Sequence, residues 1–325
     1  ARTKFVRARV SGKGKDDKRA GLWHPTFTRT LRTMAPNFIG TRKKMARKAL
    51  GVGTALSVAL LVMAPGGIAA AQRAKPAPDQ LVPEYEIPQW DPTTWVSDWA
   101  TVCSEVSGAH GGSFVVANID QTGPYGGGPG SAPVAAWSSV LNNCVDSGRA
   151  TVLGYVPTNW GEGGNYTMAN IETWVNEWYS YYHGDIGGIF FDQVSDTNPL
   201  TGASNVSFYQ TLDAYVHQHE GNNDEVVLNY GSNPGSAWMF NSSNAKNADI
   251  VVTFEGPSSA YPSWSPASWE SQYPADDFAA LVWGELNSPT SECSGLLQQN
   301  LGYLDVTSYY SGPLPSYFSQ MVADC

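Results

Sequence analysis

Positive charge is almost missing from the last 250 residues of this 325-residue chain. Only Arg149 and Lys246 occur there, together with 27 of the 29 acidic residues, since Asp16 and Asp17 are the other two. A surface so poor in bases repels nucleic acid and anionic membranes. The charge balance therefore argues against both partners and favours a neutral or cationic ligand.

Several motifs of enzyme chemistry are also missing. The sequence has no C-x-x-C pair, no Cys/His cluster with zinc spacing and no G-x-S-x-G elbow. The glycine-rich stretch 126–130 contains Pro129 and has no Lys or Arg nearby, which disfavours phosphate binding. His217 and His219 are two residues apart on a predicted helix, so their rings face different sides. We therefore predict neither a metal site nor a cofactor.

Residues 1–75 differ sharply from the rest, because they carry seventeen of the nineteen Lys and Arg. Within them, residues 45–71 have a basic start, an apolar run and small residues at Ala69–Ala71, a pattern typical of a secretory signal peptide. The apolar run is too short and too rich in Gly and Ala for a good membrane span. We expect a basic N-terminal extension at 1–44 that the mature protein lacks, a signal peptide at 45–71, a linker at 72–80 and a secreted domain at 81–325. A functional basic arm is the alternative for the extension.

Short apolar runs alternate with helix-compatible stretches through the secreted domain. The eight runs are 81–88, 113–120, 150–158, 186–194, 225–231, 249–256, 278–284 and 301–308. The expected helices are 92–109, 131–147, 168–183, 204–220, 236–246, 264–273, 289–300 and 313–323. Several runs are apolar at consecutive positions, which indicates strands buried on both faces. Eight such units in this length predict one (β/α)₈ TIM barrel, of class α/β.

An open, doubly wound sheet is the competing fold. It would show a glycine-rich phosphate turn after its first strand, where this chain has Pro88-Gln-Trp-Asp91. The four cysteines in a secreted domain predict two disulfides. Because successive barrel helices are neighbours, the barrel order predicts the pairs Cys103–Cys144 and Cys293–Cys325.

Polar side chains follow directly on many of the apolar runs. In barrels of this kind, the reactive groups lie at the carboxyl ends of the strands. Glycosidic cleavage needs two carboxyl groups on either side of one bond. Strands four and six are separated by a single strand, so Asp192 and Glu255 can meet across one sugar. We expect Asp192 to be the nucleophile and Glu255 the general acid/base. The expected substrate-binding residues are Asn118, Asp120, Tyr155, Gln193, Asn229, Tyr230 and Trp283.

Each carboxylate also has a structural interpretation, since an Asp that ends a strand often caps the next helix. Asp305 fits that interpretation best, because only two strand residues follow it. Aromatic residues fall in the predicted loops as well, where they suit either sugar rings or loop packing. They are Tyr125, Trp160, Trp238, Tyr261 and Trp264.

Four motifs in register resemble a known family over about residues 81–325. They are Leu81–Pro88, Val116–Asn118 with Gly123-Pro124 and Gly128–Gly130, Leu153–Thr158, and Gly187–Asp192. Together they are similar to spherulation-specific family 4, which includes glycoside hydrolase family 135. The resemblance implies a (β/α)₈ barrel that cleaves α-1,4-linked galactosamine or N-acetylgalactosamine in secreted exopolysaccharides. It also implies an acidic pair ending strand four and a Glu ending strand six, which Asp192 and Glu255 match in part.

The second acid of that pair is absent, because Gln193 stands where the family has Glu. An amide can bind a hydroxyl or acetamido group but cannot donate a catalytic proton. Our working hypothesis is a retaining, endo-acting hydrolase of amino-sugar polysaccharide in which Asp192 and Glu255 suffice. The alternatives are a non-catalytic polysaccharide-binding or coat protein on the same barrel, and a barrel glycosidase for another cell-wall polysaccharide.

Overall fold

The computed structural model describes most of the expected secreted domain. The described residues are 78–85, 93–109, 112–119, 128–130, 132–146, 150–220, 224–235, 247–287, 289, 293, 299–309 and 313–325. The expected extension, the signal peptide and the linker as far as residue 77 lie outside the described residues. The same holds for Asp120, Tyr125, Trp238, the helix expected at 236–246 and most of the one expected at 289–300.

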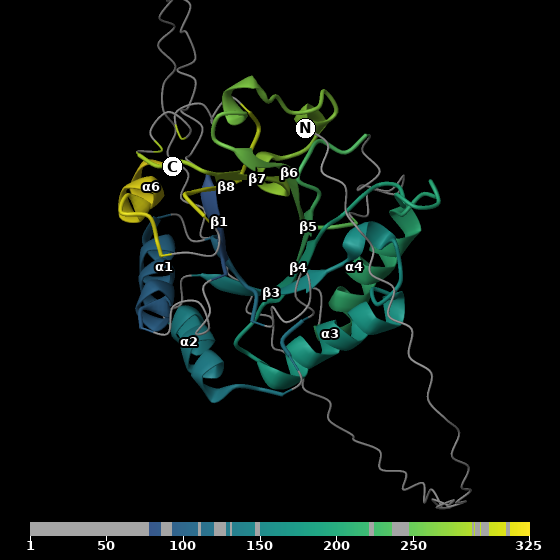
Figure 1. Cartoon of the computed structure of the whole chain (residues 1–325), viewed down its shortest axis with the longest axis horizontal. Helices are drawn as coiled ribbons and strands as arrows, with labels where there is room; N and C mark the ends of the chain where they lie inside the picture. The colour runs from purple at the N-terminus through teal and green to yellow at the C-terminus, as the bar shows by residue number, and fades with distance from the viewer. Residues whose placement is uncertain are drawn as a thin grey trace, which may run out of the picture. The chain divides into compact units, whose positions relative to one another are not determined.

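Eight parallel strands close into a barrel in chain order, so that β1 pairs with both β2 and β8 (Figure 1). The strands are β1 (Asp79–Glu84), β2 (Phe114–Ala117), β3 (Thr151–Pro157), β4 (Gly188–Asp192), β5 (Glu225–Asn229), β6 (Ile250–Pro257), β7 (Phe278–Trp283) and β8 (Tyr303–Thr307). The predicted (β/α)₈ fold is thereby confirmed.

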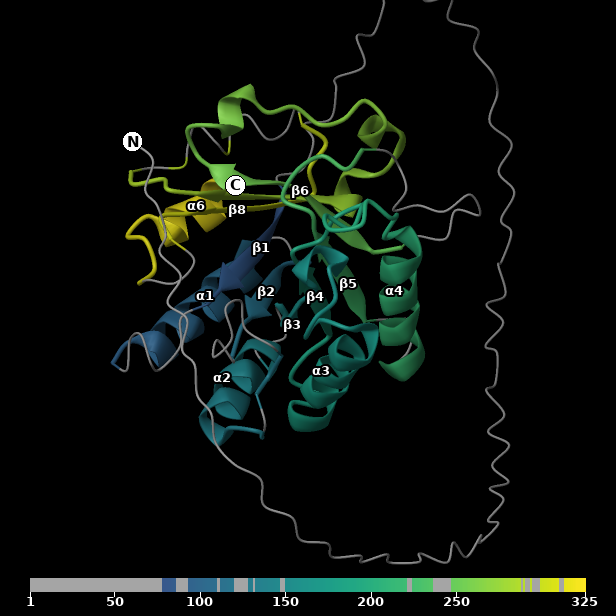
Figure 2. The same cartoon turned by 45° about the vertical axis from the view of Figure 1, so that its right-hand side comes forward.

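Helices cover the outside of the barrel between successive strands (Figure 2). The α-helices are α1 (Trp95–Ala109), α2 (Ala135–Asp146), α3 (Met168–Tyr181), α4 (Val206–Glu220) and α6 (Phe318–Asp324). Short 3₁₀ helices are η1 (Asn159–Gly161), η3 (Tyr261–Ser263), η4 (Glu270–Gln272) and η5 (Ala275–Asp277).

Two of the expected helices are wrong in the described part. The stretch 264–273 holds only η4, and the helix expected at 313–323 begins five residues later, at Phe318. Proline is the physical reason in both places, because it lacks the N–H of an interior helix position and its ring obstructs the preceding turn. Pro266 lies within the first stretch and Pro274 directly follows it, while Pro313 and Pro315 lie at the start of the second.

The strands bury both faces, which explains their unbroken apolar runs. One cluster fills the barrel interior, and its members include Leu81, Phe114, Val116, Leu153, Phe190, Val227, Val252 and Leu281. A second cluster packs the outward-facing residues against the helices. Side chains alternate along a strand, so every second residue of each strand faces the barrel interior. The inward-facing residues nearest the carboxyl ends of the strands lie beyond the apolar core, at the open end of the barrel called the mouth below.

Strand β6 departs from this alternation at one point. Ile250 and Val252 face the interior, but the register with β7 shifts between Val252 and Phe254, as at a β-bulge. Phe254 consequently joins the outer cluster, and Glu255 turns inward. Strict alternation from Val252 would have placed Phe254 inside and Glu255 outside.

Both predicted disulfides are present. Cys103 of α1 pairs with Cys144 of α2, and Cys293 pairs with Cys325, which follows α6 at the end of the chain. Among the described residues, no helix is both long enough and apolar enough to cross a membrane.

Candidate active site

Asp192 ends β4 inside the mouth of the barrel, and donors surround its carboxylate. The Tyr155 hydroxyl donates to Oδ2 at 2.7 Å, and the Asn229 side-chain nitrogen donates to Oδ1 at 2.7 Å. The backbone N–H of Gln193 is a third donor to the carboxylate. Loss of water raises the pKa of Asp192 above its usual value, while these three donors act in the opposite direction.

Asn229 connects the two predicted catalytic carboxylates. Its side-chain nitrogen also donates to Glu255 Oε2, at 2.6 Å. The bonded oxygens of Asp192 and Glu255 are therefore at most 5.3 Å apart, the sum of the two donor–acceptor distances. Carboxyl groups of retaining glycosidases lie about 5 to 5.5 Å apart, and those of inverting enzymes about 6.5 to 9.5 Å.

The strand registers place one inward side chain from each even-numbered strand at nearly the same level of the mouth. These side chains are Asn118, Asp192, Glu255 and Thr307. Asn118 and Thr307 are buried, and Trp283 at the end of β7 is 40% exposed. The structure thus brings Asn118, Tyr155, Asn229 and Trp283 to the same end of the barrel as the two carboxylates.

Gln193 has a left-handed backbone, with φ of 58°. Its carbonyl accepts hydrogen bonds from the Thr158 hydroxyl and the Trp160 N–H, which hold the peptide in this strained conformation. The side-chain Oε1 is buried and has no hydrogen-bond partner among the described residues. Strain of this kind in a non-glycine residue is concentrated at functional sites.

Tyr230 lies away from the carboxylates. Its hydroxyl accepts from the backbone N–H of Asp196, and its ring packs against the outer cluster. Tyr261 and Trp264 also pack there, stacked on each other with ring centroids 5.9 Å apart and both against Phe254. For these loop aromatics the structure favours loop packing over free sugar-binding faces.

Two further side chains belong to the site: Tyr85, which was not expected from the sequence, and Asp305, which was interpreted there as structural. The Tyr85 ring meets Tyr155 edge to face at 5.5 Å. Burial, and then the charges of Asp192, Glu255 and Asp305, raise the pKa of Tyr85. Asp305 of β8 is 2% exposed and continues the interior series, where burial raises its pKa to about 8. The inward orientation of both side chains could have been predicted from the alternation of β1 and β8. Tyr85 follows the inward Leu81 by four residues, and Asp305 follows the inward Tyr303 by two.

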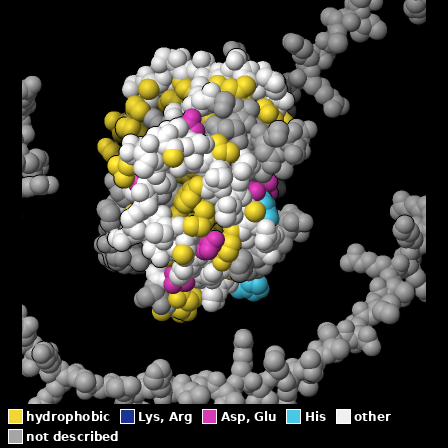
Figure 3. Space-filling model, turned by 90° about the vertical axis from the view of Figure 1, so that its right-hand side faces the viewer, with side chains coloured by type: hydrophobic (Ala, Val, Ile, Leu, Met, Phe, Trp, Pro, Cys, Tyr) yellow, Lys and Arg dark blue, Asp and Glu magenta, His cyan; other side chains and the backbone are white. Residues whose placement is uncertain are grey.

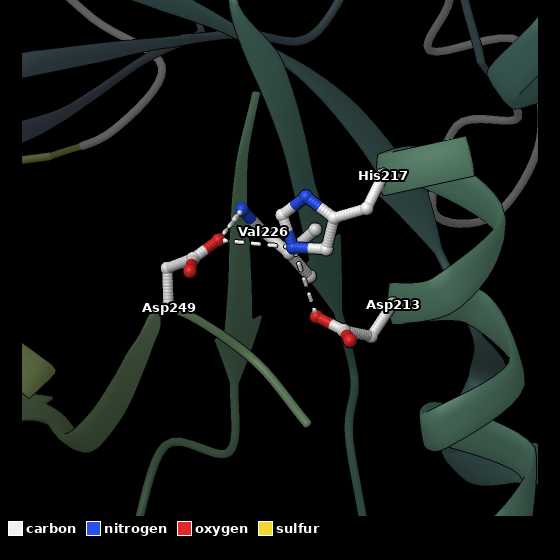
Figure 4. A network of polar contacts seen from close by, with 4 residues as sticks. All are labelled: Asp213, His217, Val226 and Asp249. Atoms are coloured by element: carbon white, nitrogen blue, oxygen red, sulfur yellow. Dashed lines mark hydrogen bonds and ion pairs between the residues drawn. The ribbon is translucent and has the colours of Figure 1, made fainter. Parts of the chain in front are cut away.

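A second polar network lies at the opposite, amino-terminal end of the strands (Figure 4). His217 Nε2 of α4 is 3.4 Å from carboxylate oxygens of both Asp213 and Asp249. Asp249 also accepts the backbone N–H of Val226 at 2.9 Å. This network ties α4 to the beginnings of β5 and β6, and polar groups at that end of a barrel serve stability rather than chemistry.

The described surface carries no positive charge from lysine or arginine, since none of the described residues is of either type. Figure 3 shows Asp, Glu and His side chains among uncharged groups on one face. Arg149 and Lys246, the two bases of the expected secreted domain, lie outside the described residues.

Comparisons with known proteins show to which family this chain belongs. No curated protein matches. Among solved structures, a family GH18 chitinase from Chromobacterium violaceum is 13% identical, with a TM-score of 0.37, over 76% of this chain and 78% of its own. A GH5-4 broad-specificity endoglucanase from Ruminococcus champanellensis is 14% identical, with a TM-score of 0.39, over 73% and 84%. Residues 80–324 match the family described as spherulation-specific family 4, so this chain belongs to that family.

Proposed function

We propose that this protein is a secreted, endo-acting glycoside hydrolase that retains the configuration of the sugar it cleaves. The observation that carries the proposal is the shared Asn229 amide. It sets the bonded oxygens of Asp192 and Glu255 no more than 5.3 Å apart, which supports the close arrangement of retaining enzymes over the wider separation of inverting ones.

In the proposed reaction, Asp192 attacks the anomeric carbon while Glu255 protonates the leaving oxygen. The glycosidic bond breaks, and a covalent glycosyl–Asp192 ester forms. Glu255, now ionised, takes a proton from water, and the resulting nucleophile attacks the same carbon. That step releases the sugar and restores both side chains to their starting states. The three donors on Asp192 favour the anion that the first step requires.

The proposed substrate is an α-1,4-linked galactosamine or N-acetylgalactosamine exopolysaccharide, as in glycoside hydrolase family 135. The absence of lysine and arginine from the described residues supports a polymer with free amino groups. Asn118, Tyr155, Gln193 and Trp283 are proposed substrate contacts, as is Asp120, which lies outside the described residues. The two disulfides support export to an oxidising compartment.

The test is release of reducing ends from partly deacetylated galactosaminogalactan-type polymer. Asp192→Asn and Glu255→Gln should each lower the rate by at least about 10³-fold. Glu172→Gln on α3, outside the barrel, is the matched control and should leave the rate unchanged. NMR of the first products should show the anomeric configuration of the substrate.

One observation favours a second candidate, a polysaccharide-binding protein, because Gln193 replaces the acid of the family pattern. Binding of the polymer without product, unchanged in Asp192→Asn, would establish the binder and reject the hydrolase. A panel of cell-wall polysaccharides tests the third reading, a glycosidase for another polymer.

A further inference from the structure

The side-chain nitrogen of Asn229 has two hydrogens, and the site uses both. One is donated to Asp192 and the other to Glu255, at 2.7 and 2.6 Å. Asn229 ends β5, the strand that pairs with β4 on one side and β6 on the other. It is therefore placed between the two strands that carry the carboxylates. Its side chain is 5% exposed, so water has little access to either hydrogen bond.

We propose that Asn229 is a positioning residue that couples the two carboxyl groups. Its nitrogen keeps Asp192 in the anionic form and confines the proton of Glu255 to the other carboxyl oxygen, Oε1. This role rests on the proposed hydrolase function and deepens it, because it explains how Asp192 stays ionised and which oxygen of Glu255 carries the proton.

The chemistry of the contact supports the coupling. Two carboxylates this close repel each other when both are ionised, which normally drives one of them to take up a proton. Each N–H donor stabilises a carboxylate oxygen as an acceptor. Since Oε2 of Glu255 already accepts from Asn229, a proton on Glu255 is favoured at Oε1.

The identity of the residue matters as well. An amide donates without titrating, so the coupling persists across the whole pH range, as it would not with histidine. The amide orientation follows from its neighbours, because the reverse orientation would set Oδ1 against the Asp192 anion. In the orientation found, Oδ1 is buried and has no hydrogen-bond partner among the described residues. The side chain is thus held by its two carboxylate contacts and not by a bond to its oxygen.

The decisive measurement is the pH–rate profile of Asn229→Ala beside that of Tyr155→Phe. The acid limb reports the group that must be ionised, and the alkaline limb the group that must be protonated. Tyr155 donates to Asp192 alone, so its loss should move only the acid limb upward, by about one pH unit. Loss of Asn229 removes a donor from both carboxylates, so both limbs should move upward. We also expect kcat to fall about 10- to 100-fold and KM to change less than about threefold.

The alkaline limb distinguishes positioning from a purely structural role. If both limbs of Asn229→Ala stay in place while the activity falls only with the folded fraction, the proposal is overturned. It is also overturned if Tyr155→Phe moves the alkaline limb as far as Asn229→Ala does. Should the alanine variant fail to fold, Asn229→Leu approximately keeps the shape and removes both donors without adding a charge, and the same upward shifts are expected.

A readout independent of turnover separates this proposal from the hydrolase assignment. Carbon-13 NMR of the labelled Asp192 and Glu255 carboxyl groups follows their titration in an inactive protein as well as in an active one. In Asn229→Ala both resonances should titrate at higher pH than in the wild type. Unchanged titration would reject the coupling, whereas absence of reducing ends from the wild type would reject only the hydrolase.

Discussion

Asp305 leads to a quantitative prediction about stability, because it is an acid inside the barrel core. Its pKa in the folded protein is about 8, raised by burial from an ordinary value of 3.8. Between these values the folded chain keeps a proton that the unfolded chain releases. The stabilising effect of that proton is complete below about pH 4 and is lost as the pH rises to about 8. A shift of about 4 pH units is worth up to roughly 6 kcal/mol, at about 1.4 kcal/mol per unit.

The perturbation that exposes this effect is Asp305→Asn, which keeps the shape and removes the titration. Urea unfolding followed by tryptophan fluorescence, at half-unit steps from pH 5 to 7.5, gives the free energy of unfolding of both proteins. Relative to the variant, the wild type should lose about 1.4 kcal/mol per pH unit. Other buried acids such as Glu270, whose pKa burial raises to about 7, are common to both proteins and cancel in the difference. Parallel curves for the two proteins would refute the reasoning, because Asp305 would then ionise in the folded state.

Two further predictions concern the scaffold. Replacing Cys103 and Cys144 together with serine opens a loop of 41 residues and should lower the free energy of unfolding by about 4 kcal/mol, measured by urea denaturation; a change below about 1 kcal/mol would contradict it. Gly154→Ala should cost about 1 to 3 kcal/mol, because the added Cβ would lie 2.6 Å from Cδ2 of Trp178 in the packed outer core. Gly163→Ala is its control, since nothing lies within 4 Å there and only its positive φ is strained, at about 1 kcal/mol. Equal thermal shifts for these two variants would reject the steric argument.

The barrel was predictable because its strands are buried on both faces. Runs such as Ile250–Val252 are apolar at consecutive positions, and this pattern can be recognised in the sequence without knowledge of the fold. The helix expected at 264–273 was wrong, because the prolines in and next to that stretch were not taken into account. In the structure the prolines prevail, since a missing N–H cannot be compensated inside a helix.

The positions of the site residues were also predictable only in part. The position of Asp192 was predictable, because it ends an apolar strand whose carboxyl end lies at the mouth of the barrel. Tyr85 was not, since the first run was taken to continue through Pro88 whereas β1 ends at Glu84. Asp305 was assigned a structural role from its position near the strand end, and its complete burial depends on packing from the whole barrel. Tyr230 was expected to bind substrate because it lies at a strand end, but Asn229 and Tyr230 are consecutive and point to opposite faces.

The bulge in β6 makes the position of the second carboxylate depend on backbone geometry as well as on residue type. Deleting one residue between Val252 and Glu255 would remove the bulge and leave Glu255 two positions after Val252, so that it would still face the barrel interior opposite Leu281. Straightening the bulge at unchanged chain length is what would turn Glu255 toward the helices and bring Phe254 inside. The side chains that hold the bulge in place therefore matter as much to the position of this carboxylate as the choice of Glu at residue 255.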